Sequence, residues 1–312
     1  MHLNFVKKNM RILVTGASGL IGTKLCNHLL SKGHSFHILT TRSPWQVENE
    51  QTQIFRWAPQ NNEIDSRALD GVDAVINLTG AKINQRWTTK SKAAILKSRT
   101  ESTRLLFDTI QKTQQKVHFI NASAIGIYRS DFNKQYTESD KEFSDAFDGV
   151  VVRQWEEEAK QFEKLSCHTT ILRIGLVLSN TGGAFIPLSV PTRWGLGAWF
   201  GNGQQWQSWI HIDDLIGVID HCLQHQLVGC VNATAPNPVR QRDLIRTIAK
   251  SAGAPQFLPG LPKVVMSFFL GEMHKLVFDS IYVKPQKLLD SHYQYKFSDI
   301  TSCVTDLMQK KK

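Results

Sequence analysis

The clearest chemical signal in the sequence is a loop of three glycines, Gly16, Gly19 and Gly22, between the apolar stretch 11–15 and a helix-like stretch. In such a loop the first glycine permits a tight turn, the second lets the backbone approach a pyrophosphate, and the third lets the helix pack closely on the strand. The start of the helix adds free N–H groups and the positive end of the helix dipole. The alternative is a turn that needs glycine only for its flexibility. The predicted dinucleotide contacts in this loop are Gly16, Ser18, Gly19, Leu20, Ile21 and Gly22.

The end of the second expected strand, residues 35–41, indicates which dinucleotide would bind. Proteins that bind NAD usually place an acidic residue there, which holds the ribose 2′-hydroxyl group. Here Thr41 is followed by Arg42, without an acidic residue. A guanidinium paired with a 2′-phosphate contributes about 1.5–3 kcal/mol, so we predict NADP(H) rather than NAD(H). The alternative is that Arg42 is a solvated side chain at the end of a strand.

A second group of residues that could do chemistry is His211 with Asp213 and Asp214. His211 alternates with Ile210 and Ile212 on a strand-like segment, which would let its ring face a cleft. We expect Asp213 or Asp214 to cap the helix that follows. Because one histidine without further ligand spacing does not make a metal centre, we predict no metal site.

These residues are positioned by strands that alternate with helices. This order predicts right-handed βαβ units and an α/β fold: a Rossmann-type, doubly wound parallel sheet with a smaller C-terminal lobe on the substrate side. We expect the Rossmann domain over residues 10–180 and the lobe over residues 181–305. The expected strands span residues 11–15, 35–41, 53–57, 73–78, 116–122 and 169–178, and the expected helices span residues 20–31, 88–111 and 149–164.

Composition excludes several classes of protein. The chain has 312 residues, of which 41% are hydrophobic and 21% charged, as in an ordinary globular protein. No apolar stretch approaches the ~20 residues of a membrane span, so we expect no membrane partner. The net charge of +10 suggests anionic partners, but no aromatic and basic recognition motif points to nucleic acid. Five dispersed cysteines and no leader-like apolar segment favour the cytoplasm.

Several short segments, taken in order and spacing, resemble the "epimerase family protein" group of atypical short-chain dehydrogenase/reductases, which carry a small C-terminal domain of unknown function. The resemblance covers about residues 10–305 and would place that domain at about residues 255–302. The segments are Asn77-Leu-Thr-Gly80, Gln85-Arg-Trp87, Ser98-Arg99, Ala122-Ser-Ala-Ile-Gly126, Arg153-Gln-Trp-Glu156, Arg173-Ile-Gly-Leu-Val-Leu178, Gly195-Leu-Gly197, Gly203 to Trp206, Trp209-Ile-His-Ile-Asp-Asp214, Ala235-Pro-Asn-Pro238 and Lys284-Pro-Gln-Lys-Leu288.

The resemblance implies NADP(H) binding and extends the expected contacts beyond the glycine loop. Arg86 stands in a basic stretch, where it could face a phosphate or be a surface side chain. An aromatic loop, residues 195–206, follows the sixth strand and is a candidate for binding a second ligand. The further cofactor contacts that the resemblance implies are Thr41, Arg42, Trp57, Asn77, Leu78, Thr79, Gly80 and Leu176.

The catalytic residues of a short-chain dehydrogenase are only partly present. The resemblance implies a Ser or Thr that holds the substrate oxygen, for which Ser123 is the candidate. It also implies a Tyr-x-x-x-Lys pair near residues 147–156, but this stretch has neither residue, and Val152 occupies the lysine position. Tyr128 could act as the acid/base instead, or pack in the core.

Two functions remain open from the sequence. The first is an NADP(H)-dependent oxidoreductase or epimerase-like enzyme that acts on a small polar or nucleotide-linked substrate. The second is a non-catalytic NADP(H)-binding sensor or regulatory protein, which the missing Tyr-x-x-x-Lys pair favours. In both cases we expect a monomer or homodimer with a small-molecule ligand.

Overall fold

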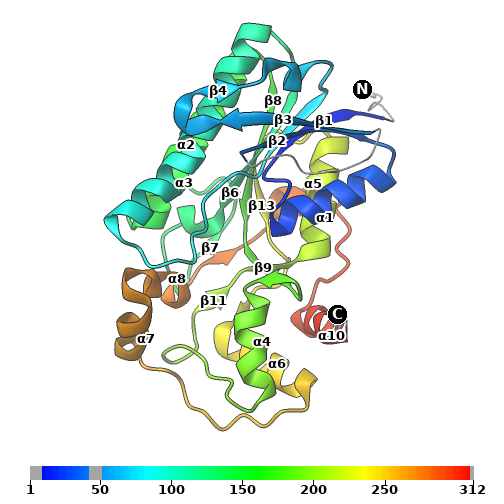
Figure 1. Cartoon of the computed structure of the whole chain (residues 1–312). Helices are drawn as coiled ribbons and strands as arrows, with labels where there is room; N and C mark the ends of the chain where they lie inside the picture. Colours follow the sequence, from blue (N-terminus) through cyan, green and yellow to red (C-terminus); the bar gives the residue numbers. More distant parts are fainter. Residues whose placement is uncertain (1–8, 42–50, 310–312) are drawn as a thin grey trace.

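Eight strands form one sheet in the part of the chain that the computed structural model describes, residues 9–41 and 51–309 (Figure 1). The strand order is β13-β8-β6-β5-β1-β2-β3-β4, and all neighbouring strands are parallel except β3 and β4. The strands are β1 (Arg11–Thr15), β2 (Ser35–Thr40), β3 (Thr52–Ala58), β4 (Glu63–Ile64), β5 (Ala74–Asn77), β6 (His118–Ala124), β8 (His168–Ile174) and β13 (Gly229–Ala233).

Helices cover both faces of this sheet. On one face lie α1 (Leu20–Ser31) and α5 (Ile212–Gln224), and on the other lie α2 (Thr89–Thr113) and α3 (Phe147–Lys160) (Figure 1). Successive side chains of β1 point to opposite faces of the sheet. Val14 packs in the core under α1, and Leu13 packs in the core under α2. The prediction of a Rossmann-type doubly wound sheet is confirmed.

Most expected elements agree with the structure. The helix expected over 20–31 is α1, and the first five expected strands differ from the observed ones by at most two residues at either end. One prediction was wrong: the strand expected over 169–178 is two strands, β8 and β9 (Leu176–Ser179). The chain leaves the large sheet at Gly175, where an ideal Cβ would lie 2.4 Å from the carbonyl oxygen of Ser208. The close approach of these two backbones redirects β9, which pairs with β12 (Trp209–His211) and β10 (Gly182–Gly183).

The smaller lobe is built mainly from the segments after β9. Its core lies among α4 (Phe185–Arg193), α6 (Gln241–Ala252) and α10 (Ile300–Gln309). The chain returns from this lobe to form β13, so part of the sequence after residue 180 belongs to the Rossmann layer. The remaining elements are β7 (Gln135–Tyr136), β11 (Trp206–Gln207), β14 (Val239–Arg240), β15 (Tyr282–Val283), α7 (Lys263–Leu270), α8 (His274–Phe278) and α9 (Gln286–Asp290).

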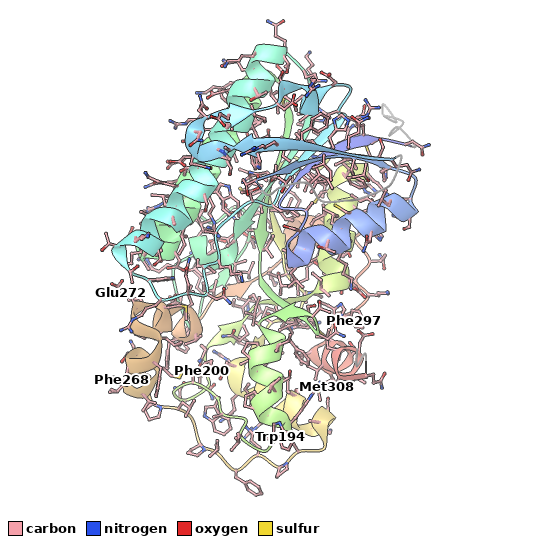
Figure 2. The ribbon with its side chains drawn as sticks, viewed as in Figure 1. Trp194, Phe200, Phe268, Glu272, Phe297 and Met308 are labelled. Carbon is pink, nitrogen blue, oxygen red and sulfur yellow. The ribbon has the colours of Figure 1, made fainter. Side chains whose placement is uncertain are left out.

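The segment with α7 and α8 reaches back towards the Rossmann layer. Glu272, which follows α7, lies near the N-terminal end of α2 (Figure 2) and forms a 2.6 Å ion pair with Lys92 of α2. Trp194, by contrast, is exposed at the far end of α4 (Figure 2). Among the described residues, no helix has the length and apolar character that crossing a membrane requires.

Candidate functional site

The glycine loop connects the end of β1 to the start of α1, and two of its glycines are required by the fold itself. Gly16 has φ +69°, and an ideal Cβ on it would lie 2.8 Å from the carbonyl oxygen of Leu78. A Cβ on Gly22 would lie 2.3 Å from the carbonyl oxygen of Gly16. Gly19 differs, because its φ of −78° suits any residue and the closest atom to an ideal Cβ is 3.3 Å away. A Cβ on Gly19 would therefore make one close contact, with the Gly16 carbonyl oxygen, and without it the backbone of the loop stays accessible to a phosphate.

The first turn of α1 is arranged to attract a negative charge. Gly19 is the N-cap and supplies no side-chain hydrogen bond, and no acidic residue stands in the first turn. The first N–H groups of a helix have no acceptor within the helix, and they form the positive end of its dipole. Ser18 and Gly19 are exposed, and Leu20 and Ile21 are half-buried. This end of α1 fits the pyrophosphate of a dinucleotide.

Asn77, expected to contact the cofactor, uses its side chain inside the protein. Its Oδ1 accepts a 2.6 Å hydrogen bond from the Thr15 hydroxyl, and its Nδ2 donates to Asn121 at 2.7 Å. These bonds tie together the carboxyl ends of β1, β5 and β6. The backbone that follows, Leu78 to Gly80, is half-buried or exposed beside the glycine loop. In this segment the Thr79 hydroxyl is buried without a hydrogen-bond partner among the described residues.

Arg99, on α2, lies against this same segment. Its guanidinium donates hydrogen bonds to the carbonyl oxygens of Ala81 at 3.2 Å and Ile95 at 2.9 Å, and its Cζ would be 3.0 Å from a Cβ on Gly80. Burial lowers the pKa of Arg99 to about 10. Its cationic group also lies 5.1 Å from the Trp155 ring. Arg99 is thus a partly desolvated cation beside Gly80.

The other expected cofactor residues lie around the loop in different environments. Thr41 is exposed directly after β2, and Arg42 lies outside the described residues. Trp57 is only 3% exposed and packs in the core under α2, so only its backbone is available to a ligand. Arg86 is exposed in the connection between β5 and α2. Leu176 begins β9 and pairs with Trp209.

The β9–β10 hairpin completes the rim of the glycine loop. An ideal Cβ on Gly182 of β10 would lie 3.2 Å from a methyl group of Leu20, so the hairpin packs against the start of α1. The structure therefore brings the glycine loop, the segment Leu78 to Gly80 and this hairpin together.

The two expected catalytic hydroxyls lie in a buried polar network. The Ser123 hydroxyl donates to Oε1 of Glu156 at 2.6 Å, and Arg173 donates to both oxygens of Glu156 at 2.8 and 2.9 Å. Arg173 also donates to the Tyr128 hydroxyl at 2.8 Å, and this hydroxyl is 2.8 Å from Oδ1 of Asn232. Burial raises the pKa of Tyr128 to about 12. Both hydroxyls are thus committed to partners within the protein.

The structure draws attention to Asp148, which the sequence analysis overlooked. Since Val152 occupies the lysine position of Tyr-x-x-x-Lys, the tyrosine position is four residues earlier, at Asp148. This residue, in the first turn of α3, is only 4% exposed, and its Oδ1 has no hydrogen-bond partner among the described residues. Counting back from Val152 would have found it.

The His211 group lies inside the smaller lobe. His211, not an aspartate, is the N-cap of α5, because its Nδ1 accepts a 3.0 Å hydrogen bond from the backbone N–H of Asp213; the expectation of an aspartate cap was wrong. Nε2 of His211 lies 3.3 Å from Asp306 of α10, and its ring packs against Phe297. Asp214 instead accepts hydrogen bonds from the backbone of the segment before α10. His211 is 1% exposed, so its ring does not face an open cleft.

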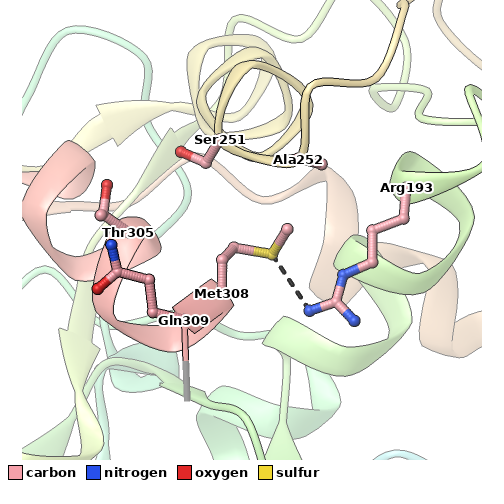
Figure 3. A pocket seen from close by; sticks show the side chains of 6 residues that line it. All are labelled: Arg193, Ser251, Ala252, Thr305, Met308 and Gln309. Carbon is pink, nitrogen blue, oxygen red and sulfur yellow. Dashed lines mark hydrogen bonds between the residues drawn. The ribbon is translucent and has the colours of Figure 1, made fainter. Parts of the chain in front are cut away.

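A cavity of about 420 Å³ lies elsewhere, between α4, α6 and α10 (Figure 3). Arg193 reaches across it, with Nη2 3.3 Å from the Met308 sulfur. None of the expected site residues lines this cavity, so it is separate from the glycine loop. Its lining residues are Arg193, Ser251, Ala252, Thr305, Met308 and Gln309.

Comparisons with known proteins agree with this architecture. The profile of the NAD dependent epimerase/dehydratase family matches residues 12–232, and that of a domain of unknown function, DUF1731, matches residues 261–307. Epimerase family protein SSP1921 of Staphylococcus saprophyticus is 36% identical over 298 residues, which cover 95% of this chain and 98% of that protein. Epimerase family protein SAR0825 of Staphylococcus aureus is 36% identical over 96% of this chain and 99% of its own.

Solved structures give the same result. The human epimerase family protein SDR39U1, crystallised with NADPH, has a TM-score of 0.85 and 28% identity, covering 97% of this chain and all of that one. A nucleoside-diphosphate sugar epimerase from Corynebacterium glutamicum has a TM-score of 0.77 and 27% identity, covering 96% of this chain and 58% of that one.

Proposed function

Because the chain belongs to the NAD dependent epimerase/dehydratase family, we propose that it binds NADP(H) and acts as an oxidoreductase or epimerase on a small polar or nucleotide-linked substrate. The observation that carries the proposal is the start of α1, where no side chain covers the backbone at Gly19 and no acidic residue stands in the first turn. The free N–H groups at the start of α1 support it. The NADPH bound to the human relative supports the same cofactor here.

Each part of the chain has a distinct task in this proposal. The start of α1 binds the pyrophosphate, and Leu78 to Gly80 present backbone to the cofactor. Arg99 places a partly desolvated positive charge beside Gly80, where an anionic group would be favoured. When bound, the nicotinamide supplies or accepts a hydride. The chain orients the two ligands and keeps water away from that ring.

The aromatic loop over residues 195–206 supports a substrate with a ring or an anionic group. The guanidinium of Arg240 stacks 3.6 Å from the centre of the Trp206 ring, so a cation and an aromatic face stand together. A nucleotide-linked substrate carries both a base for stacking and phosphates for a cation.

The preference for NADP(H) over NAD(H) rests on Arg42, which follows Thr41 at the end of β2. A fluorescence titration with NADPH and with NADH tests it, on the wild type, on Arg42→Ala and on the control Arg56→Ala. Arg56 is an exposed arginine on β3. We expect at least about a tenfold preference for NADPH, lost in Arg42→Ala and kept in Arg56→Ala. Equal binding of NADPH and NADH to the wild type would contradict the assignment of Arg42.

A non-catalytic NADP(H)-binding sensor is the second candidate. It is favoured by the engagement of both hydroxyls inside the protein, that of Ser123 by Glu156 and that of Tyr128 by Arg173. Turnover distinguishes the two candidates. Oxidation of bound NADPH by any member of a panel of carbonyl compounds and nucleotide sugars would support an enzyme. Tight NADPH binding without turnover across the panel would support a sensor.

A further inference from the structure

Asp148 is a buried residue with one carboxyl oxygen that the described residues leave unpaired. It is 4% exposed, yet its Oδ1 has no hydrogen-bond partner among the described residues. Leaving a buried polar atom unpaired costs free energy, so nearly all such atoms in proteins have a partner. By contrast, the neighbouring buried carboxylate on the same helix, Glu156, is paired through both oxygens with Arg173. We therefore expect the unpaired oxygen of Asp148 to bind a ligand or to take part in a reaction.

The position of Asp148 places it on the edge of the sheet that carries the glycine loop. Its Oδ2 would lie 3.0 Å from a Cβ on Gly126, which belongs to the short 3-10 turn Ile125–Ile127 directly after β6. Strand β6 is separated from β1 only by β5. Two strand spacings amount to roughly 10 Å, a distance that a dinucleotide extending from the loop can bridge. The half-buried or exposed backbone that follows β5, Leu78 to Gly80, lies between the glycine loop and the turn beside Asp148.

The burial of Asp148 favours retention of its proton. Burial raises the pKa of Asp148, against the opposing effects of the backbone N–H groups of Asp148 and Gly149 and the cation of Lys275. Asp279, which follows α8, is a second carboxyl group nearby, and burial together with Asp148 raises its pKa to about 6. Lys92 of α2 reaches the adjacent Phe147 ring but is paired with Glu272. Two neighbouring carboxyls that share a desolvated site hold a proton more tightly than either would alone.

We infer that Asp148 is the proton donor and acceptor of the proposed reaction, an inference that rests on the proposed function. In the reductive direction, a bound reduced nicotinamide would supply the hydride that the carbonyl carbon of the substrate takes up. The carbonyl oxygen accepts the proton of Asp148, the C=O double bond becomes a single bond, and Asp148 is left as a carboxylate. Solvent returns the proton. In the oxidative direction the same carboxylate accepts the proton of the alcohol.

The inference can be tested without knowing the substrate, because a carboxylate beside the nicotinamide distinguishes the cationic ring of NADP⁺ from the neutral ring of NADPH. The measurement is calorimetric titration of both dinucleotides between pH 5 and 9. In the wild type we expect NADP⁺ to gain at least about tenfold in affinity relative to NADPH as Asp148 ionises. In Asp148→Asn the ratio of the two affinities should not change with pH.

Two further variants make this result specific. Asp145→Asn removes the same charge three residues earlier, from an exposed side chain, and should keep the wild-type change. Asp279→Asn removes the neighbouring carboxyl group. In this variant the ratio of NADP⁺ to NADPH affinity should still change with pH, but at a lower pH than in the wild type. Asp148→Ser repeats the test if Asp148→Asn does not fold.

The outcomes separate the inference from the proposed function. A ratio that changes with pH in Asp148→Asn as it does in the wild type would overturn the role of Asp148 while leaving NADP(H) binding intact. A wild type whose ratio is constant with pH would also overturn it. Failure of the wild type to bind either dinucleotide would overturn the proposed function, and the inference with it.

Discussion

The glycine loop and the Ser123 network lie at the same edge of the same sheet, but they use their polar groups in opposite ways. At the loop, the first N–H groups of α1 have no partner in the helix, and no side chain covers the backbone at Gly19. In the network, the polar groups of Ser123, Glu156 and Arg173 bond to one another, and these residues are 1–3% exposed.

This difference distinguishes residues that can act on a ligand from residues that hold the fold. A hydroxyl that is fully bonded inside the protein must break those bonds before it reaches a substrate, whereas an unbonded N–H group is ready to bind. We therefore propose that the loop is the binding region and that the network is a brace between α3 and β8. Asp148, which lies on the same helix as Glu156 but is unpaired, belongs with the loop.

The largest expected effect comes from breaking the network. Glu156→Gln leaves the guanidinium of Arg173 buried without a counter-charge, so we expect a loss of about 3–5 kcal/mol in the free energy of unfolding, measured by urea denaturation. The control is Glu158→Gln on the same helix, whose partner Arg104 is largely exposed. That variant should lose no more than about 1 kcal/mol. Similar losses in both variants would show that the network is no brace.

A substitution in the glycine loop should instead lower NADPH affinity while the free energy of unfolding is kept. Gly19→Asp places a preferred N-cap residue at the start of α1, which offsets the close contact of its Cβ with the Gly16 carbonyl oxygen, so we expect little change in stability. Its carboxylate lies over the loop and repels phosphate, so NADPH affinity should fall by at least about 100-fold, or about 2.7 kcal/mol.

The control for the added charge is Gly253→Asp, where an ideal Cβ meets no atom within 4 Å; because Gly253 has φ +62°, this variant should lose about 1 kcal/mol in the free energy of unfolding. Calorimetry with NADPH should show wild-type affinity for this variant. Retention of NADPH affinity in Gly19→Asp would place the cofactor elsewhere.

Removing single hydroxyls from the network should weaken stability and leave binding unchanged. In Tyr128→Phe, Arg173 and Asn232 each lose a hydrogen-bond partner, so we expect a loss of about 1–3 kcal/mol in the free energy of unfolding. Ser123→Ala should cost less, because Glu156 keeps both bonds from Arg173. NADPH titration of both variants should match the wild type. A large loss of NADPH affinity with unchanged stability would show that these hydroxyls belong to the binding site.

The smallest effect concerns pH. Burial and Asp148 raise the pKa of Asp279 from its ordinary value of 3.8 to about 6, so the folded protein binds a proton that the unfolded chain has released between these values. Stability from this group is therefore present below about pH 4 and is lost as pH rises through about 6. The loss, compared with Asp279→Asn in denaturation between pH 4 and 7, should be on the order of 1 kcal/mol after allowance for solvent screening. A difference between the two proteins that is constant with pH would contradict the raised pKa.

Much of the fold could be predicted from the sequence because local patterns determine it. The apolar runs, the glycine spacing and the alternation of elements predict α1, the doubly wound parallel sheet and the approximate bounds of its first strands. The break at Gly175 could not be predicted, because its cause is the carbonyl oxygen of Ser208, more than 30 residues later. The cap of α5 was mistaken for a similar reason. Aspartate is the usual cap, but the ring of His211 is fixed here by contacts with Phe297 and Asp306.

The candidate site likewise has features that the sequence predicts and features that it does not. Glycines in the loop can be recognised because their role depends on near neighbours in the chain. Whether a hydroxyl is free depends on distant partners: Ser123 meets Glu156 of α3, and Tyr128 meets Arg173 of β8. Asp148 was accessible to sequence reasoning by spacing alone, but its unpaired oxygen is visible only in three dimensions.

The most direct test of the central claim is hydrogen–deuterium exchange of the wild type with and without saturating NADPH. We expect slower exchange of the backbone N–H groups of residues 16–22 and 78–81 when NADPH is present. The strands of the Ser123 network and the cavity between α4, α6 and α10 should exchange as before. Protection confined to that cavity, with no change in the glycine loop, would contradict the account.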